Sequence, residues 1–237
     1  MFQNCYSLKD LDISGWKMNS NNYSSFFSNC YSLESVNISG LDFSNCTNIS
    51  NMFYACYSLK NIIWPTGTID TSKITTMVSL FYYCHSLSSV NLNFSDMSKV
   101  TTIANMFYNC NALKSVSINN WTLTKCTTMV DMFRYCYQLE EISWTGWSLP
   151  ALNTALSTVL AQCYSLKKIT GFPPIKLNFS MAECYNLPIA QIVGLFNNLQ
   201  TLPSGTSRTI NMTTANINRL SAAEKAIATN KGWTLAN

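Results

Sequence analysis

A cysteine followed three residues later by a leucine recurs along most of the chain at an almost constant spacing. The cysteines of this motif are Cys5, Cys30, Cys56, Cys84, Cys110, Cys136, Cys163 and Cys184, so the successive steps in residue number are 25, 26, 28, 26, 26, 27 and 21. Self-similarity at a period of about 20 to 29 residues with a leucine-rich core is typical of a solenoid, in which each repeat stacks on the next. This feature therefore predicts the architecture of most of the 237 residues.

Two hydrophobic periods alternate inside each repeat. Before the cysteine, apolar residues such as Met52, Phe53 and Cys56 are spaced as on one face of a short helix. After the leucine, alternating residues such as Val90 and Leu92 are typical of a short strand. The pattern predicts an α/β leucine-rich-repeat solenoid with a parallel sheet and short convex helices. Because packed helices need roughly 8–10 Å and parallel strands only about 4.8 Å, we expect the sheet to be concave.

The chain divides into two segments by this pattern. Residues 1–202 hold about eight to nine repeats with a period of about 26 residues, and Leu195–Pro203 is a last remnant of the motif. Residues 203–237 are expected to be a capping segment. The first residues, Met1 to Cys5, already match the interior of a repeat. We therefore expect a truncated or uncapped N-terminal end, on which an upstream domain or another chain docks.

The capping segment has its own local signals. Thr209–Met212 has the composition of a strand, and Ser221 and Glu224 form a capping box that opens a helix. Gly232 follows as a helix C-cap, before a final strand at Trp233–Leu235. We expect a strand-helix-strand cap over the last repeat.

One repeat is longer than its neighbours. The step from Cys56 to Cys84 is the longest of the series, and Trp64-Pro65-Thr66-Gly67 lies just past its expected strand. A proline and a glycine in that place indicate a bulged corner.

The ten cysteines allow two interpretations. The repeat cysteines end an apolar face, and Cys46 and Cys126 stand where other repeats carry Ile74 and Val100, which favours buried free thiols. Disulfides between neighbouring repeats are the alternative, since stacked repeats come within bridging range. Neither a Cys-x-x-Cys motif nor a Cys/His cluster is present, so we expect no metal site.

Composition argues against two classes of partner. The net charge is +4 without a run of basic residues, so we expect no nucleic-acid binding. The sequence contains no apolar stretch long enough to span a membrane, and we expect no direct membrane insertion.

Motifs of catalysis are also missing from the sequence. It has one histidine and neither a nucleophile motif nor a phosphate-binding loop. Glu140 and Glu141 are expected to be neighbours on a strand that point to opposite sides, unlike two carboxylates that flank a substrate bond. We therefore expect a protein that is not an enzyme and needs no cofactor.

The repeat resembles a known family. The constellation Met-Phe-Tyr-x-Cys-x-x-Leu-x-x-Val-x-Ile, together with Ser-Lys-Val-Thr-Thr, is similar to the BspA-like leucine-rich repeats, named after a Bacteroides surface protein. The resemblance covers roughly residues 1–202, and the ending Ala226–Leu235 is similar to the close of such arrays. It implies cell-surface adhesion to host proteins or to other cells. Similar arrays occur in gut bacteria and their phages.

Polar residues on the expected strands form two columns that are candidates for ligand binding. These candidates are Asn37, Asn91, Ser117, Ser143, Lys60, Lys114 and Glu140. Short amides and hydroxyls on a rigid sheet bind a peptide or sugar with little ordering cost. The alternative is a solvated strand surface on which lysines and glutamates alternate so that like charges do not stack.

An aromatic ladder follows the repeat cysteines. Its candidate ligand-binding members are Tyr57, Tyr137 and Tyr164, and His85 stands in the same position of another repeat. Stacked tyrosines offer a carbohydrate platform or an assembly face, or they cover the corners of the core with their hydroxyls in water.

Two functional hypotheses follow. The first is an extracellular or cell-surface adhesion module that recognises a host or microbial surface protein or glycan on its concave face. The second is a structural, receptor-binding or assembly subunit of a phage particle or another large complex, in which case the location is the virion.

Overall fold

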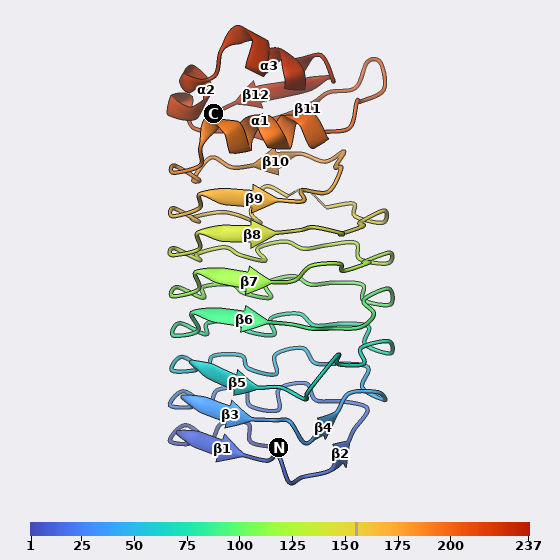
Figure 1. The fold of residues 1–237 in the computed structure, drawn as a ribbon, viewed down its shortest axis with the longest axis vertical. Coiled ribbons are helices and arrows are strands. Elements are labelled where there is room, and N and C mark those ends of the chain that lie inside the picture. The colour runs from blue at the N-terminus through green and yellow to red at the C-terminus, as the bar shows by residue number, and fades with distance from the viewer. Residues whose placement is uncertain (155) are drawn as a thin grey trace.

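The computed structural model describes residues 1–154 and 156–237 and has the form of an elongated stack of rungs, each rung being one repeat (Figure 1). The elements in chain order are β1 (Asp10–Asp12), β2 (Met18–Asn19), β3 (Ser35–Asn37), β4 (Leu41–Asp42), β5 (Asn61–Ile63), β6 (Ser89–Asn91), β7 (Ser115–Ser117), β8 (Glu141–Ser143), β9 (Lys168–Thr170), β10 (Phe179–Ser180), α1 (Ile189–Asn198), β11 (Arg208–Asn211), α2 (Thr214–Arg219), α3 (Ala222–Thr229) and β12 (Trp233–Ala236).

Rungs are joined by parallel backbone pairing along three walls. The first wall holds the sheets β1-β3-β5 and β6-β7-β8-β9, with residues one repeat apart in register. On the second wall, parallel bridges link Asn22, Asn48, Thr76, Thr102 and Thr128 in succession. The third wall holds the pair β2-β4 and the bridges Ile69–Phe94 and Thr122–Ser148. The predicted repeat solenoid with parallel strands is confirmed.

In the described residues, the segment before each repeat cysteine is not helical, and this part of the sequence prediction is wrong. It consists of tight turns, and in the repeats from Cys30 to Cys136 the backbone is left-handed at two places, for example at Asn105 (φ 57°) and Asn109 (φ 59°). A right-handed helix does not continue through such residues. The amide of Phe107 instead donates a 2.9 Å hydrogen bond to the carbonyl of Met132 in the next rung. Backbone polarity is thus satisfied between rungs rather than within a helix.

Without convex helices, the reason for expecting a concave sheet no longer applies. Both the strand wall and the turn wall are now hydrogen-bonded from rung to rung, so both have the spacing of paired strands, about 4.8 Å. We therefore replace the expected concave face by what we call the strand face, the outward surface of β1, β3 and β5 to β9.

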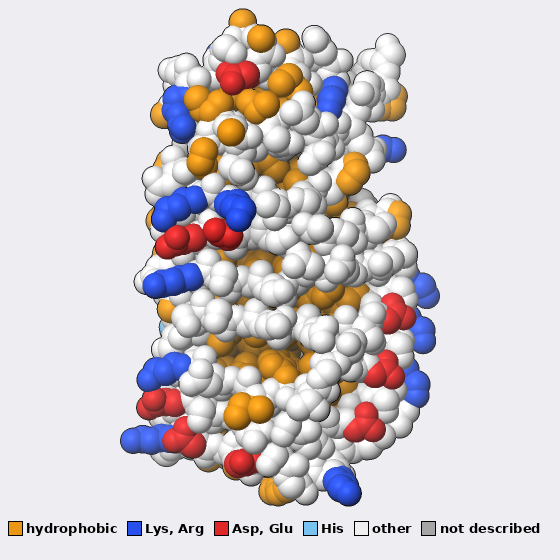
Figure 2. All heavy atoms as spheres, viewed as in Figure 1, with side chains coloured by type: hydrophobic (Ala, Val, Ile, Leu, Met, Phe, Trp, Pro, Cys, Tyr) orange, Lys and Arg blue, Asp and Glu red, His pale blue; other side chains and the backbone are white. Residues whose placement is uncertain are grey.

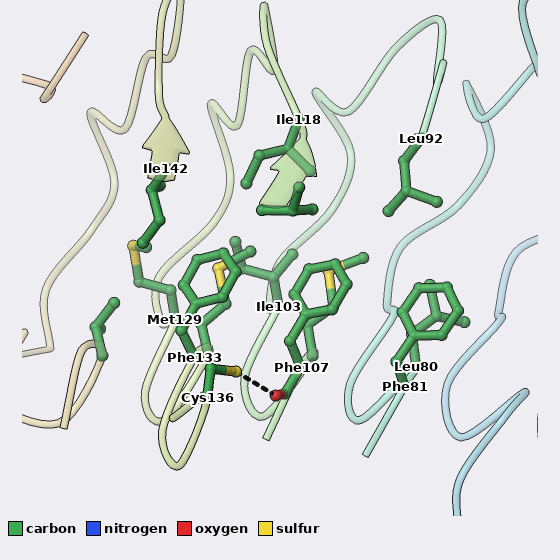
Figure 3. Close-up of a cluster of buried hydrophobic side chains, with 14 of the residues drawn as sticks. Leu80, Phe81, Leu92, Ile103, Phe107, Ile118, Met129, Phe133, Cys136 and Ile142 are labelled. Carbon is green, nitrogen blue, oxygen red and sulfur yellow. Dashed lines mark hydrogen bonds between the residues drawn. The ribbon is translucent and has the colours of Figure 1, made fainter. Parts of the chain in front are cut away.

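The core contains a continuous row of phenylalanines. Phe27, Phe53, Phe81, Phe107 and Phe133 are fully buried, and neighbouring rings stack with centroids 5.3–5.6 Å apart. Figure 3 shows Phe81, Phe107 and Phe133 in a row, facing Leu92, Ile118 and Ile142 from the opposite wall. The residues that the helical spacing marks as apolar are therefore buried, although the backbone is not helical.

The cysteines are free thiols in this structure, and nine of the ten are buried. This agrees with the first interpretation of the cysteine pattern, and rung-to-rung disulfides are not formed among the described residues. Thiols along the row donate to a carbonyl one rung earlier, as Cys56 does to Phe27 and Cys84 does to Phe53, both at 3.2 Å.

The C-terminal end departs from the repeat. Strands β10, β11 and β12 form a separate parallel sheet, and α3 begins with the predicted capping box between Ser221 and Glu224. The remnant expected at Leu195–Pro203 instead begins within helix α1, which ends at Asn198. The side chain of Gln191 in α1 accepts a 2.9 Å hydrogen bond from the amide of Ile169 in β9. Helix α1 thereby covers the end of the second strand-face sheet.

Candidate binding surface on the strand face

The third residue of each strand forms an outward column on the strand face. Asn37, Asn91, Ser117 and Ser143 belong to it, as predicted, because strand residues two apart share a face and the strands pair in register. Asn91 and Ser117 are exposed, whereas Asn37 and Ser143 are half-buried. Ile63 interrupts this polar column with a side chain that is 57% exposed.

The residues just before the strands form the predicted charged column. Lys60 pairs with Glu34 at 2.7 Å, and Lys167 pairs with Glu140 at 3.1 Å, so opposite charges alternate from rung to rung. Lys114 is exposed between these pairs. Ion pairs this exposed contribute about 0–1 kcal/mol each. Their main effect here is to leave the strand face with few uncompensated charges.

A third outward column lies between the other two and was missed by the sequence analysis. Its residues are Asp10, Ser35, Asn61, Ser89, Ser115, Glu141 and Lys168. Their outward position could have been inferred from the sequence, because each lies two residues before a member of the third-residue column. Glu140 and Glu141 both point outward, because Glu141 pairs with Lys168 at 3.1 Å while Glu140 pairs with Lys167. The expectation that these neighbours point to opposite sides is therefore wrong.

The strand face is split between β5 and β6. Within the part of the chain that the structure describes, no ladder joins these strands, although β5 pairs with β3 and β6 pairs with β7. The two rungs are joined by backbone hydrogen bonds again at both ends of the split. The amide of Ser86 donates to the carbonyl of Tyr57 at 3.1 Å, and the amide of Ile69 donates to the carbonyl of Asn93 at 2.8 Å. The result is a slit with closed ends.

The slit is a hollow of about 590 Å³ with an apolar interior and a polar rim. It is lined by Ser35, Lys60, Asn61, Ile62, Ile63, Trp64, Leu87, Ser88, Ser89, Val90 and Asn91. Figure 1 shows β5 and β6 further apart than the strands on either side, and Figure 2 shows hydrophobic side chains in a hollow at this height. A second hollow of about 530 Å³ lies beside Trp147, Pro150 and Pro173, among the irregular repeats.

The tyrosine ladder is formed, and its rings stack on one another. Tyr57 lies between Tyr31 and His85, with centroids 4.9 Å and 5.2 Å away. Tyr137 and Tyr164 stack at 5.5 Å. Because these ring faces contact neighbouring rings, a sugar would meet mostly ring edges and hydroxyls. Burial against neighbours is also the main cause that raises the pKa of Tyr57.

Two features of other functional classes are absent from residues 1–154 and 156–237. These residues contain no group of three or more histidine, cysteine or acidic side chains placed to hold a metal. Across the same residues, no helix has the length and apolar character needed to cross a membrane. His85 belongs to the tyrosine ladder, where its Nδ1 lies 3.1 Å from the carbonyl oxygen of Asn109.

Stacked parallel rungs, a leucine-rich core and a polar strand face define the molecule as a solenoid repeat protein of leucine-rich-repeat character. That fold is typical of proteins that bind other molecules without catalysis. The chain belongs to the family described as "Mycoplasma protein of unknown function, DUF285", whose model matches residues 1–65 and 60–170. No curated protein matches the chain. A solved leucine-rich-repeat protein of Leptospira interrogans is similar over 99% of this chain and 79% of that chain, at 11% identity and a TM-score of 0.31.

Proposed function

We propose that this protein is a non-catalytic adhesion module whose strand face recognises a surface protein or glycan of a host or of another microbe. The observation that carries the proposal is the set of polar columns held in register by the rung pairing. Rigid display of this kind lets weak contacts add with little loss of conformational entropy on binding.

The proposed location is a bacterial cell surface. It rests on the similarity of the repeat to BspA-like repeats and on the strand face, which is rich in amides and hydroxyls and carries paired charges. Nucleic acid is not the proposed partner, because the lysines at the edge of this face are largely paired with glutamates. No cofactor is part of the proposal.

Substitution of the third-residue column tests this function. A variant combining Asn37→Ala, Asn91→Ala, Ser117→Ala and Ser143→Ala would be compared with wild type on a glycan array and on immobilised extracellular-matrix proteins. A matched control combines Thr75→Ala, Thr101→Ala and Thr127→Ala, which are exposed on the second wall. We expect the first variant alone to lose binding. Loss of binding in the control alone would overturn the proposal.

A second candidate function is assembly into a larger particle through the N-terminal rung. Its basis is the outer edge of β1, which pairs with no strand in the described residues, and Trp16, which is 44% exposed beside Phe2. Analytical ultracentrifugation over a concentration series tests self-association. Assembly through this edge predicts oligomers that Trp16→Lys dissociates. Oligomers that persist unchanged in Trp16→Lys would count against it.

A further inference from the structure

We propose that the slit between β5 and β6 binds an extended, uncharged peptide segment as an inserted strand. This inference rests on the proposed function and deepens it, because it names the class of partner and the place on the strand face. Four features of the slit support it: the β5 wall, the β6 wall, the chemistry of the interior and rim, and the sequence insertion from which it originates.

The β5 wall presents unpaired backbone groups to the slit. Along a strand, the N–H and C=O of one residue point to one side and those of the next residue to the other. The carbonyl of Ile63 accepts a 2.9 Å hydrogen bond from the amide of Ile38, on the β3 side. The backbone groups of the flanking residues Ile62 and Trp64 therefore point toward β6, with which no ladder is formed in the described chain.

The β6 wall mirrors this arrangement. The amide of Leu92 donates a 3.2 Å hydrogen bond to the carbonyl of Ser117, on the β7 side. By the same alternation, the backbone groups of Ser89 and Asn91 point toward β5. Both walls thus present alternating N–H and C=O dipoles. One peptide strand is complementary to both walls at once, which is the geometry of strand addition with two edges instead of one.

The interior of the slit favours a peptide with an apolar side chain. Ile62, Leu87 and Val90 line the hollow, and Trp64, which also lines it, has a buried indole N–H without a hydrogen-bond partner in the described part of the chain. Unpaired buried donors are uncommon, because each carries the cost of lost hydration. At about 590 Å³, the hollow lies within the range of roughly 300–1,000 Å³ found for ligand sites.

Charge at the rim favours a neutral occupant. Lys60 is the charged residue that lines the slit, and it is paired with Glu34 at 2.7 Å. The remaining polar lining consists mainly of serine and asparagine side chains. These lining residues therefore offer no unpaired opposite charge to a strongly acidic or basic segment.

The slit originates in the sequence insertion. The step from Cys56 to Cys84 is two residues longer than the step from Cys84 to Cys110, and Pro65 and Gly67 (φ 79°) lie where β5 ends. Thr66 and Gly67 are exposed, as expected where extra residues bulge outward from a strand end. Removing Pro65 and Thr66 restores the length of the following repeat and is expected to close the slit.

The test is selection of peptides from a phage-displayed random heptapeptide library. The library is panned on wild-type protein and depleted on the variant that lacks Pro65 and Thr66. Selected peptides are synthesised with blocked ends, and their affinities are measured by titration calorimetry. Asn91→Pro removes one N–H that faces the slit, and Thr127→Ala on the second wall is the control. Circular dichroism checks the folding of every variant.

We expect selected peptides to bind wild type and the control equally. Asn91→Pro should weaken them about tenfold, the equivalent of one to two hydrogen bonds, and so should backbone N-methylation of the peptide. These two measurements keep the test valid if the deletion variant does not fold.

Other outcomes overturn the inference. Peptides whose affinity is unchanged by backbone N-methylation, or by Asn91→Pro, do not add as strands in the slit. If such peptides are lost with Ser117→Ala and Ser143→Ala, the slit is excluded while the proposed function of the strand face stands. If no peptide is selected, peptide insertion is wrong. The proposed function fails with it only if the glycan and matrix-protein arrays are also negative.

Discussion

The thiol of Cys136 donates a hydrogen bond to the backbone carbonyl of Phe107, one rung earlier, with 3.1 Å between sulfur and oxygen (Figure 3). The same carbonyl accepts the amide of Cys110 within its own turn. A cysteine at this position therefore fills a small buried space and also satisfies backbone polarity in the neighbouring rung. This explains why the cysteine, and not a purely apolar residue, marks the period of the sequence.

Alkaline pH should destabilise the fold through these thiols. Burial raises the pKa of Cys30 to about 11 and that of Cys126 to about 11. A thiol whose folded pKa lies above its unfolded value of about 8.5 contributes fully below that pH, and its contribution is lost as pH rises toward the folded value. We expect the melting temperature to be constant to about pH 8 and to fall between about pH 9 and 11.

Cys126→Val tests the origin of this fall, because other repeats carry Ile74 or Val100 at the same position. The variant should melt close to wild type at neutral pH and show a shallower decline above pH 9, as measured by calorimetry. A decline as steep as that of wild type would exclude Cys126 from the effect.

The phenylalanine row should dominate the stability of the rungs. Phe107 is fully buried between Phe81 and Phe133 at 5.3 Å from each. Phe107→Ala should lower the free energy of unfolding by about 3–5 kcal/mol, measured with urea, because it leaves a cavity in a packed core. Tyr137→Ala, whose ring is partly exposed, should cost less. Equal effects of the two variants would contradict this assignment of the core.

The left-handed turns make a prediction opposite to that of a helix. Asn105 has φ 57°, a conformation that glycine adopts without strain and alanine does not. Asn105→Gly should therefore be nearly neutral, and Asn105→Ala should cost about 1–2 kcal/mol of unfolding free energy. In a helix, alanine would be the better residue by about 1 kcal/mol. Chemical denaturation of the pair decides between the two backbones.

Proline substitutions should reveal the unpaired edge of β6. Asn91 faces the slit, whereas Ser117, one rung later, faces the paired ladder to β6. Asn91→Pro should change the unfolding free energy by less than about 1 kcal/mol, because no ladder hydrogen bond is lost. Ser117→Pro should cost about 1–3 kcal/mol, since it leaves a partner carbonyl unsatisfied. Similar melting temperatures for both variants would mean that the ladder continues across the split.

The sequence predicted the features that depend on periodicity. The strand positions, the burial of Met52 and Phe53 and the capping box at Ser221 all follow from spacing and local chemistry. The convex helices were wrong because hydrophobic spacing does not report the sign of φ. Asparagine at Asn105 and Asn109, before the cysteine of that repeat, was the available signal, since asparagine tolerates the left-handed region.

Features that depend on contacts between rungs were harder to predict. The four residues from Trp64 to Gly67 were recognised as a bulged corner, but their effect lies in the pairing of β5 with β6, which no local pattern encodes. Helix α1 was missed because Leu195 and Leu199 also match the leucine spacing of a repeat. In each repeat, two residues lie between the buried leucine and the next buried strand residue, and both point outward. Strict alternation of buried and exposed positions fails there, which is why the third outward column was missed.

The missing ladder between β5 and β6 also has a mechanical consequence. A stack pulled along its long axis is held together by backbone hydrogen bonds between rungs. The steps on either side of the split have a three-residue ladder on the strand face, whereas the step from β5 to β6 has none among the described residues and keeps the isolated bridges Ile69–Phe94 and Thr76–Thr102. Extension should therefore begin at this step, before the other rungs part. Under tension, the step between β5 and β6 should lengthen more than the parts of the solenoid on either side of it, so stretching should widen the slit.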